Sequence, residues 1–191
     1  MSIHRNPLCG RNFEYFSEDP LLSGICACYE TKGVQSFPAS GVTIKHFFCN
    51  NQEDNRMFIN VHINERALRE ISLRNFQIPI ELRNPLSIMS SYNLINGIHA
   101  ANQRSILHDV LRNEWGYNGL IMTDWCTSME ISHNFSKPNS KYPITSSKGC
   151  IIAGNDIQMP GCKESEEDII LGVENGEIKI EDLQACVVRI L

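Results

Sequence analysis

The chain has 191 residues, of which 42% are hydrophobic and 20% charged, and its formal net charge is −5. This length and composition are those of one globular domain with its own core. Lys and Arg are scattered without a basic stripe and no apolar run approaches about 20 residues, so neither nucleic acid nor a membrane is an expected partner.

The first half of the chain predicts two buried strands, each followed by a helix. The first strand covers Val42 to Phe48, and Asn64 caps the next helix, which Pro79 should kink or stop. The second strand covers Leu86 to Tyr92, and Asn102 caps the helix after it. The two helices should turn apolar faces inward, made of Ala67, Leu68, Ile71 and Phe76 in one and Ile106, Leu107, Val110 and Leu111 in the other.

The second half continues the alternation. Strands are predicted over Gly119 to Trp125 and Ile151 to Met159, with one long loop from Ser132 to Ser147 between them. A helix from Glu164 to Val173 follows, and another begins at Ile180 and should bury Leu183, Cys186, Val187 and Ile190. Short apolar strands that alternate with helices predict an α/β fold with a parallel sheet, in a single domain over residues 1–191.

The eight cysteines favour a reduced protein. Cys26 and Cys28 lie close together inside a predicted helix, the other six are widely separated, and no CxxC pair occurs. No metal site is therefore expected, and the cysteines suggest a cytoplasmic location. No secretory signal is visible in the first twenty residues. The histidines outside the first strand show no metal-ligand spacing and are interpreted as structural or surface residues: His4, His62, His99, His108 and His133.

Polar residues follow three of the predicted strands. Lys45 and His46, Tyr92, and Asp124 each lie where a strand ends. Because ligands of parallel β/α folds bind at the carboxyl ends of the strands, these side chains should form a polar pocket for a hydroxyl-rich ligand. An Asp at a strand end is by itself more often a helix cap or a loop carboxylate than a catalytic group.

Five segments, in order along the chain, resemble glycoside hydrolase family 3 β-glucosidases. They are NPLCGRNFEYFSEDP (6–20), IKHFFCNNQEDNR (44–56), IMSSYNLING (88–97), GLIMTDW (119–125) and AGNDIQMPG (153–161). The resemblance implies retaining hydrolysis of terminal β-D-glucosyl, or related β-glycosyl, residues without a cofactor. The substrate would be a β-glucoside or an oligosaccharide.

The resemblance also implies a role for particular residues. Asp124 matches the nucleophile that attacks the anomeric carbon, and Trp125 would form part of the wall that holds the sugar. The other matches are substrate-binding residues: Arg11, Lys45, His46, Arg56 and Tyr92. Glu14 is expected to hold Arg11 or a nearby loop, and Asp156 to tighten the loop after the last strand.

The family pattern covers more than this chain. Its first domain is a (β/α)₈ barrel of the TIM type, and this chain has room for the later β/α units only, so a partial barrel is expected. The acid/base glutamate would lie in a following C-terminal domain, so this domain and the rest of the barrel are expected partners. The N-acetylglucosaminidase branch is disfavoured, because Phe47, Phe48 and Cys49 follow Lys45-His46 where that branch has a different sequence.

Two alternatives remain open. The first is a catalytically inactive fragment, or pseudo-enzyme, that binds sugar weakly. The second is another β/α-barrel enzyme in which Lys45 forms a Schiff base, which would require a lysine desolvated in an apolar pocket.

Overall fold

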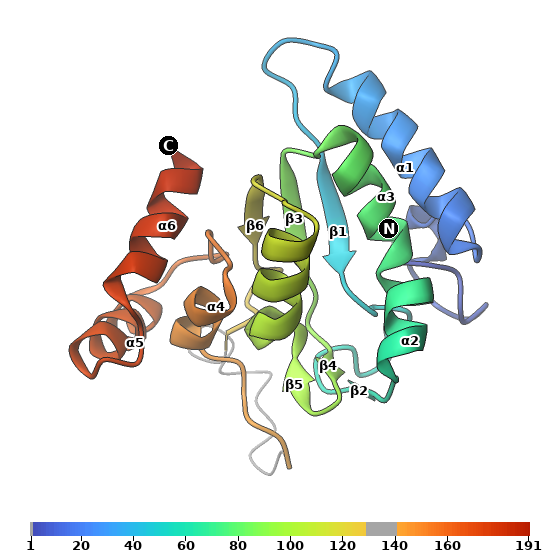
Figure 1. The fold of residues 1–191 in the computed structure, drawn as a ribbon. Helices are drawn as coiled ribbons and strands as arrows, with labels where there is room; N and C mark the ends of the chain where they lie inside the picture. The colour runs from blue at the N-terminus through green and yellow to red at the C-terminus, as the bar shows by residue number, and fades with distance from the viewer. Residues whose placement is uncertain (1, 129–140) are drawn as a thin grey trace.

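A computed structural model describes residues 2–128 and 141–191 of the chain (Figure 1). Its main sheet contains β1 (Thr43–Phe47), β3 (Ser87–Ser90) and β6 (Leu120–Met122), all parallel and in the order β1-β3-β6. The three strands thus lie in the sheet in the same order as along the chain, as in the wall of a β/α barrel. In a doubly wound sheet, by contrast, the strand order reverses at one point. Within the described residues the sheet stays open and forms no closed barrel.

Helical segments precede, connect and follow these strands. Their bounds are η1 Asn12–Glu14, α1 Pro20–Val34, α2 Glu65–Ala67, η2 Leu68–Ser72, α3 Arg74–Arg83, η3 Ala100–Asn102, η4 Ser105–Glu114, α4 Ser147–Ala153, α5 Lys163–Glu174 and α6 Ile180–Ile190. The segments η2 and η4 have the wider turns of a π-helix. Among the described helices, none is long and apolar enough to cross a membrane.

The core lies between one face of the sheet and the helices that connect its strands. Ile44, Ile88 and Ile121 pair in register across the three strands and are almost fully buried, so they form an apolar row. Helices α3 and η4 cover this row, as the ribbon shows (Figure 1). The rings of Phe47 and Phe76 meet edge-on with centroids 5.1 Å apart, a geometry that adds about 0.5–1.5 kcal/mol beyond burial.

Helix α1 packs closely against α3 through small side chains. Its buried residues are Ser23, Gly24, Ala27, Cys28 and Thr31. A Cβ on Gly24 would come within 2.7 Å of the side chain of Ile78, so the glycine sets how closely the helices approach. The helix begins at Pro20 because the carboxylate of Asp19 accepts hydrogen bonds from two free amides of the first turn.

A second, smaller sheet joins two of the loops at the carboxyl ends of the main strands. Strand β2 (Asn60–Val61) pairs in parallel with β4 (Leu94–Ile95), which pairs with β5 (Ile98–His99) in an antiparallel hairpin. Asn96 and Gly97 form the turn with φ of 50° and 92°, the left-handed conformations that a tight two-residue hairpin requires. The loop after β1 is thereby fastened to the loop after β3.

Three of the four predicted strands are confirmed and the fourth is wrong. The predicted strand from Ile151 to Met159 begins inside helix α4, and only Ile157 pairs, in an isolated parallel bridge with Met122. Ser146 caps this helix by accepting a hydrogen bond from the amide of Gly149, and Gly154 ends it with a φ of 101°. These two capping signals favour a helix, although the apolar run between them also fits a buried strand.

The predicted helices hold, with corrections to their details. Asn64 caps its helix as expected and accepts a hydrogen bond from the amide of Ala67, but α3 continues past Pro79 to Arg83. Asn102 is not a cap, because the next helix begins at Ser105 and the Asn102 amide instead packs against α4, where Cys150 donates to it. The four expected apolar residues of η4 are all buried, whereas in the preceding helix Ile71 is 40% exposed.

The last two helices start and end close to the predicted residues. In α6, Cys186 is buried and Leu183 half-buried, but Val187 and Ile190 are 48% and 49% exposed. The prediction that Val187 and Ile190 are buried is therefore wrong. Both are exposed because, within the described residues, no segment covers that side of α6. Of the predicted loop 132–147, residues 132–140, with His133, lie outside the described residues, and 141–146 form no helix or strand.

Candidate active site

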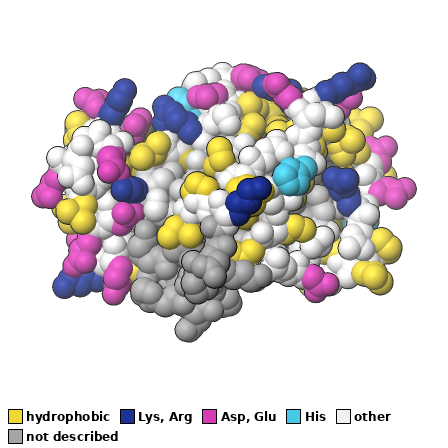
Figure 2. Space-filling view, turned by 90° about the horizontal axis from the view of Figure 1, so that it is seen from below, with side chains coloured by type: hydrophobic (Ala, Val, Ile, Leu, Met, Phe, Trp, Pro, Cys, Tyr) yellow, Lys and Arg dark blue, Asp and Glu magenta, His cyan; other side chains and the backbone are white. Residues whose placement is uncertain are grey.

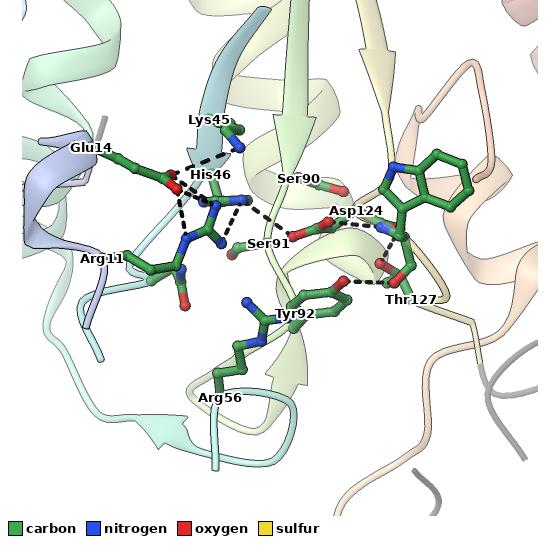
Figure 3. A network of polar contacts seen from close by, with 12 residues as sticks. Arg11, Glu14, Lys45, His46, Arg56, Ser90, Ser91, Tyr92, Asp124 and Thr127 are labelled. Carbon is green, nitrogen blue, oxygen red and sulfur yellow. Dashed lines mark hydrogen bonds and ion pairs between the residues drawn. The ribbon is translucent and has the colours of Figure 1, made fainter. Parts of the chain in front are cut away.

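The polar residues predicted at the strand ends lie together (Figure 3). Strand β1 carries Lys45 and His46, Tyr92 follows β3 by two residues, and Asp124 follows β6 by two residues. The register of β1 against β3 shifts between Lys45 and Phe47. This irregularity lets two consecutive side chains join one polar network, although neighbours in a regular strand point to opposite faces.

Asp124 and His46 form the centre of this network. Asp124 is 6% exposed and His46 is 2% exposed. One carboxylate oxygen of Asp124 accepts a hydrogen bond of 2.7 Å from the amide of Trp125, and the other lies 3.3 Å from Nε2 of His46. The hydroxyl of Tyr92 donates to the carbonyl of Trp125 at 2.6 Å, so the turn that carries Asp124 is held from two sides.

One branch of the network leads from His46 to the N-terminal loop. The guanidinium of Arg11 donates to Nε2 of His46 at 3.1 Å and binds Glu14 through three hydrogen bonds of 2.8 to 3.1 Å. The amine of Lys45 lies 3.8 Å from the same Glu14 carboxylate. Glu14 thus holds Arg11 as expected, and it also contacts a second cation.

The other branch leads from Tyr92 to the loop after β1. The guanidinium of Arg56 lies over the Tyr92 ring, 4.8 Å from its centroid, and donates to Glu53 at 2.9 Å. The pairing of β2 with β4 brings these two loops together. Neither Glu53 nor this second sheet was predicted from the sequence. A sequence signal for Glu53 was present: Glu53 and Arg56 are three residues apart, as are Arg11 and Glu14.

Burial dominates the electrostatics of the central pair. It lowers the pKa of His46 to about 2, with further lowering by Arg11 and Lys45, so the imidazole is neutral. Burial raises the pKa of Asp124, although the amide of Trp125, the hydroxyl of Tyr92 and the two arginines act in the opposite direction. The carboxylate is therefore a more basic group than a solvated aspartate.

The neutral state of His46 makes folding stability depend on pH. Below the usual histidine pKa of 6.5 the unfolded ring binds a proton that the folded ring does not, so stability should fall as pH falls from 6.5 by up to about 1.4 kcal/mol per pH unit. Urea unfolding at pH 4.5, 5.5 and 6.5 measures this slope. His46→Gln should reduce it, whereas the raised pKa of Asp124 acts in the opposite direction in both proteins. Equal slopes would contradict the prediction.

Trp125 borders an open pocket beside Asp124. Its side chain is 58% exposed, and the pocket has a volume of about 450 Å³. The residues that line it, besides Trp125, are Glu53, Asn55, Arg56, Met57, Phe58, Tyr92 and Cys126. A flat aromatic side chain in this place offers a surface for the C–H face of a sugar ring. Seen from below, acidic and basic side chains are mixed over the face, and many of them lie toward its left and right edges (Figure 2).

Asp156 lies under the site rather than in it. Its carboxylate accepts hydrogen bonds from Arg112, Arg189 and the amide of Ile121 in β6.

Among the described residues, no group of His, Cys, Asp and Glu could hold a metal ion. All eight cysteines lie in the described part of the chain and none forms a disulfide, and the cytoplasmic location stays a prediction.

Fold and site together define a parallel β/α protein with a carboxylate at the carboxyl ends of its strands and cations on either side of it. The family model of the glycosyl hydrolase family 3 N-terminal domain matches residues 1–191. This chain therefore belongs to glycosyl hydrolase family 3.

Similar proteins agree with this assignment. Beta-glucosidase B of Emericella nidulans is 42% identical over 183 residues, which are 95% of this chain and 20% of that protein. A beta-glucosidase structure from Paenibacillus barengoltzii has a TM-score of 0.88 and 37% identity, over 100% of this chain and 20% of its own. Beta-glucosidase 3B from Thermotoga neapolitana, solved with alpha-D-glucose, has a TM-score of 0.83 and 43% identity, over 98% and 25%. This chain spans about a fifth to a quarter of these relatives.

Proposed function

We propose that this chain carries the nucleophile side of a retaining β-glucosidase site, within the later part of a (β/α)₈ barrel. The observation that carries the proposal is the position of Asp124. It is buried at the end of β6, lies 3.3 Å from a neutral His46, and has an arginine on each side. A retaining glycosidase requires an ionisable carboxylate in such a place.

In this reaction Asp124 attacks the anomeric carbon of a terminal β-D-glucosyl residue. A bond forms between its carboxylate oxygen and that carbon, while the bond from the carbon to the leaving oxygen breaks. The leaving oxygen takes a proton from a general acid. Water then gives a proton back to the deprotonated acid and attacks the anomeric carbon, whose bond to the Asp124 oxygen breaks, so the sugar is freed and both carboxyl groups are restored.

The contacts around His46 favour a hydroxyl-rich ligand. Its Nε2 faces a donor, Arg11, and an acceptor, Asp124, and one nitrogen of a neutral ring can serve only one of them. A sugar hydroxyl both donates and accepts, so its entry would satisfy groups that compete in the free protein. Lys45 and Arg56 would bind further hydroxyls, and Trp125 would form a wall of the sugar site.

The general acid is proposed to lie outside this chain. Retaining glycosidases place two carboxyl groups about 5 Å apart. The carboxylates of Glu14 and Glu53 each form an ion pair with an arginine, at 2.8 and 2.9 Å, so both are already engaged and neither is proposed as the general acid. The rest of the barrel and a following domain are therefore proposed partners.

A specific observation also favours an inactive, sugar-binding protein as a second candidate. Burial raises the pKa of Asp124, and a protonated aspartic acid would bind hydroxyls without attacking the anomeric carbon. The Schiff-base alternative finds less support. The Lys45 side chain is 40% exposed and lies 3.8 Å from Glu14, so it is not the desolvated lysine that such chemistry uses.

Covalent trapping tests the proposed function. Dinitrophenyl 2-deoxy-2-fluoro-β-glucoside has a leaving group that needs little protonation, so it should label the nucleophile without the general acid. We expect one fluoroglucosyl group per chain by intact mass, with peptide mapping to Asp124. Asp124→Asn should take up none. Labelling elsewhere would contradict the nucleophile assignment, and reversible glucose binding without labelling would support the sugar-binding candidate.

A further inference from the structure

Two glutamates hold the two arginines of the site. Glu14 accepts three hydrogen bonds from Arg11, and Glu53 accepts one from Arg56. The members of each pair are three residues apart in the chain. The glutamate side chains are 24% and 23% exposed, so they are partly shielded from water, and charge at these positions is less screened than at the surface.

The arginines that they hold face Asp124 from two directions. Arg11 reaches it through Nε2 of His46, and Arg56 lies over the ring of Tyr92. Both arginines lower the pKa of Asp124. Around Asp124 the charged and titratable groups of this network are Arg11, Glu14, Lys45, His46, Glu53, Arg56 and Tyr92.

Charge in this network is balanced once the glutamates are counted. Its cations are Arg11, Lys45 and Arg56, and its carboxylates are Asp124, Glu14 and Glu53. His46 is neutral. Three positive and three negative groups therefore surround the place where the sugar would react. Without the glutamates, three cations would face a single carboxylate.

We propose that Glu14 and Glu53 are positioning residues that orient the two arginines toward the sugar and offset their charge. The inference rests on the proposed function of Asp124. Positive charge develops on the anomeric carbon in the transition state, so cations without counter-charges would oppose it. They would also hold Asp124 ionised at lower pH and make it a weaker base. The glutamates let the arginines bind hydroxyls without these two effects.

The test uses Glu14→Gln and Glu53→Gln in the full protein that contains this chain. Glutamine keeps the shape and one acceptor oxygen but removes the charge. The measurement is the rate of labelling by dinitrophenyl 2-deoxy-2-fluoro-β-glucoside as a function of pH. Each variant should react about tenfold more slowly at pH 7, and the acid limb of its profile should move to lower pH by roughly half a unit.

Glu70→Gln provides the matched control, since Glu70 pairs with Arg66 on an exposed helix. It should leave both the rate and the acid limb unchanged. Suppose that the wild-type protein is labelled on Asp124, but that the acid limb of the pH profile is the same in Glu14→Gln and Glu53→Gln as in the wild type. This inference is then wrong, while the proposed function stands. A lower melting temperature with an unchanged acid limb likewise overturns it. Absence of labelling in the wild type would overturn both.

Discussion

Replacement of Asp124 by Ala should remove the turnover of nitrophenyl β-glucoside, with a loss of about 10³-fold or more. The side chain would supply the only bond to the anomeric carbon, and no other group of the network can take its place. Glu14 and Glu53 are each paired with an arginine, and in the proposed reaction Lys45 and His46 would bind the sugar rather than attack it. Asp109→Ala is the control, because Asp109 is an exposed carboxylate paired with His108.

The choice of substrate separates the proposed nucleophile from the proposed general acid. The 191-residue chain alone should hydrolyse cellobiose about 10²–10⁴-fold more slowly than a protein extended through the proposed following domain, because cellobiose needs protonation of its leaving oxygen. The nitrophenyl glucoside needs less protonation and should lose less. Strong cellobiose turnover by the 191-residue chain as a stable monomer would show that it carries its own acid.

The largest loss of stability is expected for Asp156→Ala, at about 3–5 kcal/mol in the free energy of unfolding. The Asp156 side chain is fully buried and ion-paired with Arg112 and Arg189, whose side chains are 9% and 24% exposed. Its removal leaves two arginines without their partner and frees the amide of Ile121 in β6. Because β6 carries Asp124 at its end, labelling of the variant should fall as well.

Urea unfolding at pH 7 measures the effect of Asp156→Ala. Glu70→Ala removes an ion pair in which both side chains are mostly exposed, and it should cost less than about 1 kcal/mol. A similar, small loss in the two variants would show that Asp156 is not the anchor of β6.

Local patterns were sufficient for much of the fold. Asn64 caps its helix, and Ile106, Leu107, Val110 and Leu111 form the buried face of η4, because capping and helical periodicity act over a few residues. The strand-end rule likewise brought Lys45, Tyr92 and Asp124 to one site without knowledge of any contact. Parallel strands point the same way, so their carboxyl ends share an edge.

The sequence by itself therefore determined the β/α alternation, the family and most residues of the candidate site. Tertiary structure alone decided two things. Arg56 lies over Tyr92 because β2 pairs with β4, and Asp156 anchors β6 through two arginines. Arg56 and Tyr92 are 36 residues apart in the chain, and Arg112 and Asp156 are 44 apart, and no local periodicity records which distant partner a side chain will meet.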